Sequence, residues 1–360
     1  MELAARVSGM RVLAVNAGST SLKLSLLDAG GEAVQYDDLG AALAGPAPDV
    51  VVHRVVHGGD RHEAALVDDA LVAELESLTE LAPLHQPPAL RAMHDVREAL
   101  PGVPHVACFD TAFHRTIPAA ASTYALPARL RQQVRVYGFH GLSHAWAAGR
   151  ATSLAPQGKR VLVAHLGGGA SLCAVLDGRS IDTTMGFTPL DGLVMASRSG
   201  RVDPGAVIWL TKHTSEDVEQ VLVHESGLKG LAGTKDMREV LQRSESGDEA
   251  ATLALDVYLH RFAAEAAAMI AALGGLDVLV LTGGVGEAPG RIHDLLVQRL
   301  AWLGVRSTQP GERSGDSATD RDLTDDGSTA RVLVVHARED LQMAAEASRA
   351  LGRGAQAPAL

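Results

Sequence analysis

Aromatic residues are scarce in this sequence, since phenylalanine, tyrosine and tryptophan make up 3% of its 360 residues. With few large rings available, the interior must be filled mainly by alanine, valine and leucine. Cysteine is nearly absent as well, and Cys108 and Cys173 lie far apart in separate apolar runs. Two cysteines that lie far apart in the sequence, each within an apolar segment, predict buried thiols in a reducing compartment. They argue against a disulfide or a metal site built from cysteines.

Positive charge is in deficit, because 32 lysines and arginines face 43 acidic residues and give a formal net charge of −11. Such a balance disfavours binding to nucleic acid or to an anionic membrane, so an anionic substrate would need locally placed arginine and lysine. Long hydrophobic runs of membrane-spanning length are absent, and the N-terminus lacks a signal-peptide pattern. We therefore expect a soluble, cytoplasmic protein.

What the sequence does contain is a strand–turn–strand pattern near its start. Residues 12–15 are an apolar run typical of a buried strand, and residues 22–27 alternate like a half-buried one. Between them, residues 17–21 form a turn of small and hydroxyl-bearing residues. Gly18 permits a sharp bend, and the turn together with Lys23 can bind an anion. Taken alone, the pattern is equally consistent with an ordinary polar hairpin.

The same pattern returns over residues 161–178, with Gly167, Gly168 and Gly169 in the turn. A repeated unit in a chain of this length predicts an α/β protein with two domains of the same fold. We expect the domains over residues 1–150 and 151–339. Two facing turns, one from each domain, would clamp a chain of phosphates.

Periodicity and turn residues outline the remaining elements. Helices are expected at 68–82, 88–100, 143–154, 248–274 and 291–303, and strands at 50–52, 105–109, 276–281 and 332–335. Residues 307–329 are expected to be a surface loop and residues 352–360 a frayed tail.

A series of motifs then follows along the chain, at residues 16–23, 53–59, 109–114, 137–141, 185–190, 236–238 and 282–287. In composition and order they resemble the acetate kinase family (acetate and propionate kinases) of the sugar kinase, Hsp70 and actin superfamily. The resemblance covers nearly the whole chain. It implies two duplicated ribonuclease-H-like (actin-like ATPase) domains with a nucleotide cleft between them. It further implies that the C-terminal helix, 340–360, joins the first domain, and that the protein is a homodimer formed through the second. The apolar helix 248–274 would permit that contact, or would be the core of its domain.

The implied activity is the reversible transfer of the γ-phosphoryl group of ATP to acetate, giving acetyl phosphate and ADP with Mg²⁺ or Mn²⁺. Such a transfer needs positioning and charge neutralisation rather than covalent catalysis. By the resemblance, one of Arg54 and Arg198 holds the carboxylate and both stabilise the transferring phosphoryl group; the alternative for each is a surface salt bridge, which their motifs make the less favoured interpretation. Asp110 would orient an arginine and the metal-bound water, and His140 would donate to the transferring group.

Other site residues are implied in the same way. Asn16 and Glu339 would support the metal ion through water. The acetate pocket would comprise Arg54, Val56, Leu84, His85, Phe139 and Pro189, whose apolar members would otherwise be ordinary core residues. The nucleotide site would comprise Ser19, Ser21, Lys23, His165, Gly167, Gly168, Gly169, Asp236, Met237, Arg238, Gly284, Val285, Gly286 and Glu287. Asp236 would otherwise be an ordinary residue of a first helical turn.

The sequence also departs from the family pattern. Gly168 stands where the family usually has Asn, Arg201 where it has an acid, and Ala288 where it has Asn, while Ala337-Arg338 replaces Thr-Asn. These departures bear on nucleotide affinity and on the choice of phosphoryl donor. Two alternatives stay open: a kinase of propionate or butyrate with the same fold, and a nucleotide sensor without turnover. The retained Arg54, Arg198 and Asp110 favour an enzyme.

Overall fold

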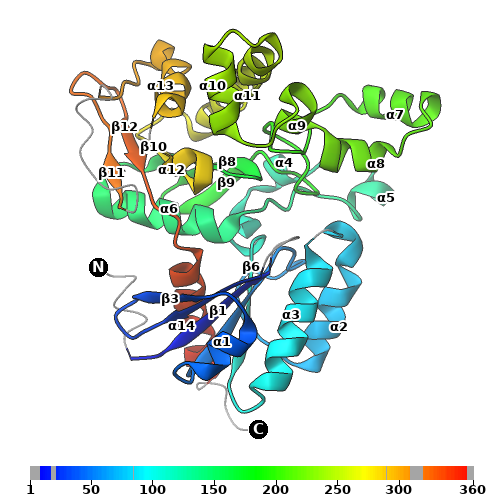
Figure 1. The fold of residues 1–360 in the computed structure, drawn as a ribbon, viewed down its shortest axis with the longest axis vertical. Helices are drawn as coiled ribbons and strands as arrows, with labels where there is room; N and C mark the ends of the chain where they lie inside the picture. The colour runs from blue at the N-terminus through cyan, green and yellow to red at the C-terminus, as the bar shows by residue number, and fades with distance from the viewer. Residues whose placement is uncertain (1–8, 18–21, 84, 289, 309–318, 355–360) are drawn as a thin grey trace. The chain divides into compact units, whose positions relative to one another are not determined.

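A computed structural model describes residues 9–17, 22–83, 85–288, 290–308 and 319–354 (Figure 1). The chain forms two compact units. Unit 1 comprises Met1–Arg115, Phe139–Trp146 and Arg338–Leu360, and unit 2 comprises Thr116–Gly138 and Ala147–Ala337. The expected domain division at residue 150 stays a prediction, and the units are described separately below.

Unit 1 is built on a six-stranded sheet of order β3-β2-β1-β4-β6-β5. Its strands are β1 (Val12–Ala17), β2 (Leu22–Leu27), β3 (Ala33–Tyr36), β4 (Val50–Val55), β5 (Ala65–Leu66) and β6 (His105–Phe109). The first three strands are antiparallel neighbours, whereas β1, β4 and β6 run parallel, and β5 pairs antiparallel with β6. In register, Val12 lies opposite Leu27 of β2 and Val50 of β4.

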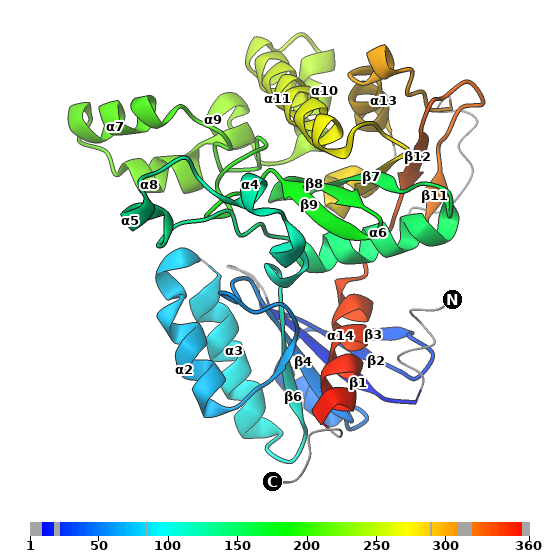
Figure 2. The same ribbon diagram turned by 180° about the vertical axis from the view of Figure 1, so that it is seen from behind.

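Helices cover both faces of this sheet, which explains why its central strands are continuous apolar runs. The helices are α1 (Leu39–Ala44), α2 (Asp69–Ser77), α3 (Gln86–Ala99) and α14 (Glu339–Gly354), with 3₁₀ turns at Thr79–Leu81 and Ala112–Thr116. On one face Val12 and Val50 pack with Met343 of α14. On the other face Leu13 packs with Ala89 of α3. Figures 1 and 2 show α14, in red, beside the blue strands that begin the chain.

Unit 2 repeats the same topology in a sheet of order β11-β12-β10-β7-β8-β9. Its strands are β7 (Arg160–Leu166), β8 (Ala170–Leu176), β9 (Arg179–Thr183), β10 (Val278–Thr282), β11 (Arg321–Asp322) and β12 (Arg331–Val334). Again three antiparallel neighbours are followed by parallel strands, here β7, β10 and β12. The predicted duplication is confirmed, because the two strand–turn–strand patterns form β1–β2 and β7–β8.

Most of the described helices belong to unit 2, and α9, α10 and α13 contact its longest helix, α11. They are α4 (Ala119–Ser122), α5 (Ala128–Arg131), α7 (Pro204–His213), α8 (Val218–Gln220), α9 (Gly227–Ala232), α10 (Met237–Glu245), α11 (Glu249–Leu273), α12 (Gly283–Glu287) and α13 (Arg291–Gln298). Helix α6 (Gly141–Leu154) begins in unit 1 and continues in unit 2. Asp248 caps the start of α11 by accepting from Ala251 N at 3.0 Å, and Gly274, with φ of +70°, ends it. Because α11 buries Leu255, Phe262 and others, it forms part of the core of its own unit.

A few elements differ from those expected. The helix predicted over 291–303 ends at Gln298 and is followed by a 3₁₀ turn, Ala301–Leu303, which Gly304 closes with φ of +78°. The short strand β11 lies within the segment expected to be a loop, and α14 extends to Gly354, into the expected tail. Cys108 and Cys173 are buried free thiols, as predicted, and burial raises the pKa of Cys173 to about 12. Among the described helices, none has both the length and the apolar character that crossing a membrane requires.

Candidate active site

The predicted catalytic residues of unit 1 converge at one edge of its sheet. Asn16 ends β1, Arg54 lies near the end of β4 and Asp110 follows β6, so the carboxyl ends of three parallel strands bring them together. The guanidinium of Arg54 forms a two-pronged contact with Asp110, with Nη2 at 2.7 Å and Nε at 3.2 Å from its carboxylate oxygens. Arg54 Nη1 also donates to Asn16 Oδ1 at 3.2 Å. A bidentate arginine held in this way presents a fixed, oriented charge.

Glu339, at the start of α14, completes this group. Asn16 Nδ2 donates to Glu339 Oε2 at 3.2 Å, and Arg54 Nη1 lies 3.4 Å from the same oxygen. Burial disfavours the charged form of Arg54, but the carboxylates of Asp110 and Glu339 outweigh burial and raise its pKa. Burial also raises the pKa of Asp110, and Arg54 opposes that rise. The side chain of Asp110 is only 1% exposed, so each charge depends on the other.

The same residues fit a magnesium ion that retains water. Asn16, Asp110 and Glu339 offer amide and carboxylate oxygens, the hard ligands that Mg²⁺ prefers. No cluster of three or more His, Cys, Asp or Glu side chains in the described segments could hold a metal ion by itself. The donor set therefore suits an ion bound through few direct contacts and several waters, and the assignment of Asn16 and Glu339 to a metal ion stays a prediction.

His140 has a backbone conformation that side-chain-bearing residues rarely adopt. Its φ is +57°, in the left-handed region, and such strain persists where the surrounding structure imposes it. The next residue explains how: Gly141 N donates to Asp110 O at 2.9 Å, and a Cβ on Gly141 would lie 2.0 Å from that oxygen. The loop carrying His140 is therefore locked against the end of β6, close to Asp110.

The sequence reasoning missed a residue that supports this loop. His114 Nε2 lies 2.9 Å from Phe139 O, and its ring packs edge-on against that of His144 at 5.6 Å. Burial lowers the pKa of His114 to about 4, so its ring is neutral at physiological pH. The histidines repeated through motifs 53–59, 109–114 and 137–141 were the signal that could have indicated such a group.

The structure describes some, but not all, of the residues predicted to form the acetate pocket. Val56 and Phe139 are both buried in unit 1, and the Phe139 ring packs edge-on against His57 at 5.8 Å. His85 immediately precedes α3. Leu84 lies outside the described residues, as do Ser19 and Ser21 of the first turn, while Lys23 lies on β2 of unit 1.

In unit 2, Arg198 and Pro189 come together. Arg198 Nη1 donates to Pro189 O at 2.8 Å and lies 3.8 Å from Met195 Sδ. The backbone nearby is tightly wound, because Gly200 has φ of +67° and a Cβ there would lie 2.2 Å from Leu193 O. Arg198 is half-buried, and this burial lowers the pKa of its guanidinium.

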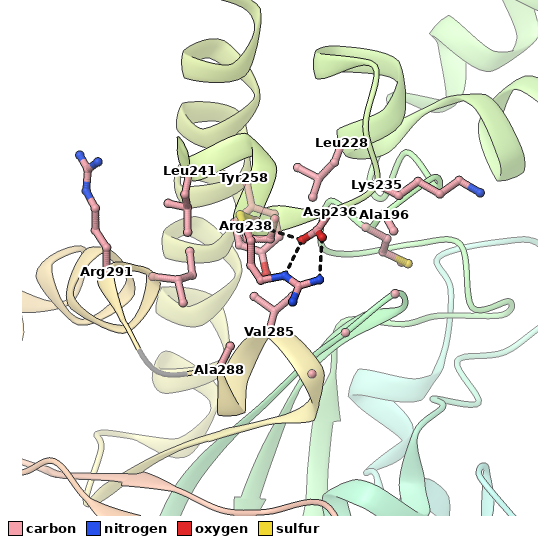
Figure 3. Close-up of a pocket in the computed structure, with 16 residues that line it drawn as sticks. Ala196, Leu228, Lys235, Asp236, Arg238, Leu241, Tyr258, Val285, Ala288 and Arg291 are labelled. Atoms are coloured by element: carbon pink, nitrogen blue, oxygen red, sulfur yellow. Dashed lines mark hydrogen bonds and ion pairs between the residues drawn. The ribbon is translucent and has the colours of Figure 1, made fainter. Parts of the chain in front are cut away.

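Unit 2 also contains a cavity of about 540 Å³ (Figure 3). Gly167 and Gly168 of the β7–β8 turn line it, and Gly284 N lies 3.9 Å from where a Cβ of Gly167 would be. Backbone N–H groups of such turns can bind phosphate oxygens. Of the predicted nucleotide residues the cavity brings together Gly167, Gly168, Asp236, Met237, Arg238, Gly284 and Val285. His165, Gly169, Gly286 and Glu287 do not belong to its lining.

Two of the predicted nucleotide residues have structural duties as well. Asp236 caps α10 by accepting from Arg238 N at 2.9 Å, and its carboxylate pairs with the Arg238 guanidinium at 2.7 Å. Both residues also line the cavity, so the capping role of Asp236 is observed and its role in nucleotide binding stays a prediction. Glu287 accepts from Gly283 N at 2.9 Å and from Ala337 N at 3.1 Å. Its carboxylate therefore joins the start of α12, where Gly283 lies, to the segment that follows β12.

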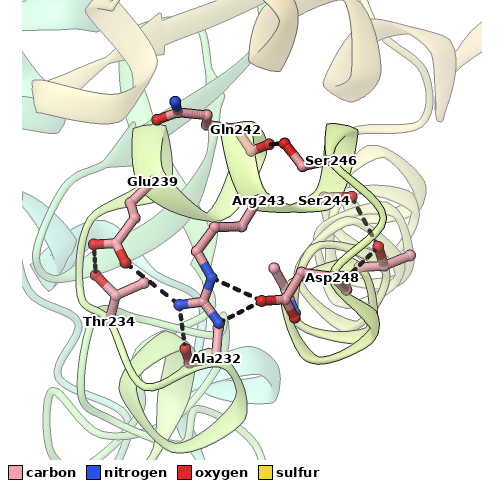
Figure 4. Close-up of polar contacts among 10 residues, drawn as sticks. Ala232, Thr234, Glu239, Gln242, Arg243, Ser244, Ser246 and Asp248 are labelled. Atoms are coloured by element: carbon pink, nitrogen blue, oxygen red, sulfur yellow. Dashed lines mark hydrogen bonds and ion pairs between the residues drawn. The ribbon is translucent and has the colours of Figure 1, made fainter.

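A network around Arg243 holds the loop before α10 (Figure 4). Arg243 Nη2 contacts Asp248 at 2.7 Å, and Nη1 donates to Ala232 O at 2.8 Å and to Glu239 at 3.3 Å. Thr234 Oγ1 donates to Glu239 at 2.6 Å. One side chain thus connects the end of α9, the cap of α11 and helix α10, the elements that carry Asp236.

The family departures also have partners in the structure. Arg201 Nη1 lies 3.2 Å from Glu265 of α11, and Ala288 lines the cavity. Arg338 pairs with Asp340 at 2.9 Å and donates to Gly31 O at 3.1 Å, on the turn between β2 and β3. Each substituted side chain therefore has a defined structural setting.

Comparison with known proteins agrees with this geometry. The family model described as the acetokinase family matches residues 47–345. An acetate kinase from Leifsonia xyli is 44% identical over 324 residues, which cover 88% of this chain and 81% of that protein.

Solved structures give the same result. A propionate kinase from Francisella tularensis aligns with a TM-score of 0.84 and 31% identity, over 93% of this chain and 98% of that one. An acetate kinase from Porphyromonas gingivalis aligns with a TM-score of 0.83 and 30% identity, over 95% and 99%.

The duplicated sheets and the glycine-lined cavity define a phosphotransferase of the actin-like ATPase fold. More narrowly, the chain belongs to the acetokinase family.

Proposed function

We propose that this protein is an acetate kinase that reversibly transfers the γ-phosphoryl group of ATP to acetate. The observation that carries the proposal is Arg54, held by Asp110 and Asn16 at the carboxyl edge of the first sheet in a chain of the acetokinase family. A carboxylate substrate needs no general base, because its oxygen is already a nucleophile at neutral pH. The protein has only to bind it, exclude water and stabilise the charge that spreads during transfer.

In unit 1, Arg54 binds the carboxylate and then the equatorial oxygens of the transferring group. Asp110 fixes the plane of the guanidinium, and His140, on its strained and locked backbone, donates a hydrogen bond to the same group. Val56 and Phe139 accept the methyl group, with His85 and the predicted Leu84 nearby in sequence. In unit 2, Arg198 supplies a second guanidinium, and Pro189 O holds it in place.

Asn16, Glu339 and Asp110 would hold Mg²⁺ through water, with Mn²⁺ as a substitute. The ion neutralises phosphate charge when it is bound. The protein's own part is to keep these oxygens in position, and the hydrogen bond between Asn16 and Glu339 does so across the first and last elements of the unit.

The cavity of unit 2 would bind the nucleotide. Gly167, Gly168 and Gly284 offer backbone N–H groups to the phosphates, and Val285, Met237 and Arg238 contact the nucleoside. Lys23, Ser19 and Ser21 of the first turn would contribute to the phosphates as the family resemblance implies.

We also propose a cytoplasmic homodimer formed through unit 2. Helix α7 buries none of its residues, and Ile208 and Trp209 are 56% and 58% exposed. Exposed apolar side chains grouped on one helix are typical of a protein interface. Helix α7 is therefore our first candidate for the contact, and α11, which fills the core with one face but also exposes Leu253 and Val257, is the second. Light scattering of the wild-type protein and of Trp209→Glu tests this: a dimer that the substitution dissociates is expected, and a wild-type monomer would contradict it.

One experiment tests the activity. A coupled assay of ADP formation with ATP, Mg²⁺ and acetate, propionate or butyrate should give the highest kcat/KM with acetate. A higher value for propionate would support the alternative that the Francisella tularensis relative suggests. ATP binding without turnover of any carboxylate would identify a sensor and overturn the proposal.

A further inference from the structure

Tyr258 is a polar residue for which the fold provides no partner. It lies on α11, is 5% exposed and lines the cavity of unit 2. None of the described residues forms a hydrogen bond or ion pair with it, and burial alone raises the pKa of its hydroxyl. Because the hydroxyl borders the cavity and is not one of the enclosed, unpartnered side-chain atoms of the described residues, it is left to hydrogen-bond water or a ligand.

Apart from Asp236 and Arg238, which pair with each other, the described residues around Tyr258 in the cavity are largely apolar. Leu228, Leu241 and Ile292 line the same cavity and come from three different helices. The charged side chains already have partners or lie elsewhere: Arg238 pairs with Asp236 at 2.7 Å and Arg291 with Glu245 at 2.7 Å. Figure 3 shows Lys235 and Arg291 extending away from the other labelled side chains. The Tyr258 hydroxyl is thus a neutral hydrogen-bonding group in the same lining as these apolar side chains, where Asp236 and Arg238 already pair with each other.

Such a lining suits a neutral ring and opposes a charged phosphate, which would lose its hydration there. Phosphates have donors elsewhere in the cavity, at the glycine turns of β7–β8 and α12. A flat nucleobase, by contrast, has apolar faces and a polar edge. The combination matches how ligand pockets fix an otherwise apolar group through a few placed polar atoms.

We propose that the Tyr258 hydroxyl hydrogen-bonds the polar edge of the nucleobase and thereby makes binding depend on the base. This inference rests on the proposed function, since it assigns the base of the phosphoryl donor to the apolar end of the cavity. Tyr258 contacts the base equally before and during phosphoryl transfer. It therefore contributes to binding and not to the rate of the chemical step.

The test is Tyr258→Phe in the full-length protein, with calorimetric binding of ADP and of inorganic pyrophosphate. Loss of one neutral hydrogen bond should weaken ADP binding by about 2- to 10-fold. Pyrophosphate has no base, so its affinity should not change. In the acetate assay the KM for ATP should rise by the same factor, with kcat unchanged. An unchanged ADP affinity, or an equal loss for ADP and pyrophosphate, would overturn the inference.

Tyr124→Phe is the matched control, because the Tyr124 hydroxyl accepts from Phe187 N at 2.9 Å. That variant should lower the thermal midpoint and leave the ratio of ADP to pyrophosphate affinity unchanged. Tyr258→Phe should leave the midpoint unchanged or raise it, and a fall as large as that of Tyr124→Phe would show that the hydroxyl serves the fold. If the wild type binds ADP but phosphorylates no carboxylate, only the proposed function fails. If it binds no ADP, both proposals fail.

Discussion

Arg54 stays protonated although its guanidinium is largely buried. Its guanidinium contacts Asp110, Asn16 and Glu339, so most of its donors are engaged before any substrate arrives. Removing Asp110 would leave a largely buried cation with only the 3.4 Å contact to Glu339 to offset its charge, which costs more than the pair with Asp110 contributes. The geometry therefore makes Arg54 a rigid element of the site.

Arg54→Ala and Arg198→Ala should each lower kcat with acetate by at least about 100-fold, since one lost transition-state donor costs about 3 kcal/mol. Arg54→Lys should rescue little, because an ammonium cannot reproduce the bidentate contact with Asp110. The control is Arg61→Ala, which removes an exposed ion pair with Glu74 in the same unit. Near wild-type kcat in either active-site variant would contradict the assigned roles.

Gly168 is a glycine whose conformation does not require glycine. Its φ is not in the left-handed region, and a Cβ there would meet no atom within 4 Å. Gly168→Asn should therefore fold normally and restore a side-chain donor to the phosphates, tightening ATP by about 1.5–3 kcal/mol at most. KM values for ATP, GTP and polyphosphate at saturating acetate measure it, and we expect the wild type to tolerate GTP and polyphosphate more readily than the variant.

Gly283→Asn is the contrasting variant. Gly283 has φ of +80°, and a Cβ there would lie 2.9 Å from Leu166 O, so this change should lower the thermal midpoint. If Gly168→Asn weakens ATP binding instead of strengthening it, the turn depends on glycine for close approach to the phosphates.

Val56 is 6% exposed in unit 1 and should limit the length of the acyl chain. Val56→Ala should raise kcat/KM for propionate or butyrate relative to acetate, because one methylene in such a pocket changes binding by roughly 1–3 kcal/mol. A ratio that the substitution does not change would place the methyl group elsewhere.

At the scale of elements, local sequence patterns predicted the strands whose formation depends mainly on the segment's own residues. The apolar run at 105–109 and the pattern at 22–27 predicted strands β6 and β2, because strand propensity is a property of the segment itself. The half-buried alternation expected for β2 was wrong: Ser25 is buried and Leu22 is exposed, because helices cover both faces of the sheet. The break after Gln298 and the short strand β11 escaped prediction. The first depends on Gly304, and the second on pairing with β12, both set by the rest of unit 2.

For the candidate site, too, the sequence predicted individual residues but not the contacts between them. The motifs identified Asn16, Arg54, Asp110 and Glu339 one at a time, whereas their hydrogen bonds join residues as far apart as positions 16 and 339. The support that His114 gives to Phe139 O follows no local pattern either. These contacts exist only because the parallel strands end at a common edge.

The Arg243 network connects several helices, so it should affect nucleotide binding although it does not contact the nucleotide. Arg243→Ala should lower the thermal midpoint and raise the KM for ATP several-fold with kcat unchanged, because α9, α10 and the cap of α11 lose their common contact. Arg299→Ala, which removes a 3.7 Å surface pair with Asp256, is the control. A changed kcat with an unchanged KM would contradict this role.

At the scale of the whole molecule, Glu346 on α14 links stability to pH. Burial is the main cause that raises its pKa to about 7, and its Oε2 has no hydrogen-bond partner among the described residues. A pKa raised by folding contributes stability below about pH 4.5, and that contribution is lost as the pH rises through 7. Glu346→Gln removes this buried charge, so the variant should gain free energy of unfolding at high pH.

We expect Glu346→Gln to increase the free energy of unfolding at pH 8 by up to about 3 kcal/mol, with little change at pH 4.5. Urea unfolding at both pH values measures it. The exposed Glu76→Gln on α2 should show no such pH dependence. An equal effect of Glu346→Gln at both pH values would mean that the carboxyl is not protonated by folding.

The position of α14 also sets the order in which the protein can be made. Unit 1 begins at the N-terminus, yet Met343, Ala344 and Ala347 fill one face of its sheet. A ribosome must therefore translate residues 116–337 before that face can be covered, which takes on the order of 10–40 s at typical elongation rates. During that interval Val12, Val50 and Cys108 lack their final neighbours. We expect chaperones to bind the incomplete unit 1 during this interval, and unit 2 receives its last residue, Ala337, only as the interval ends.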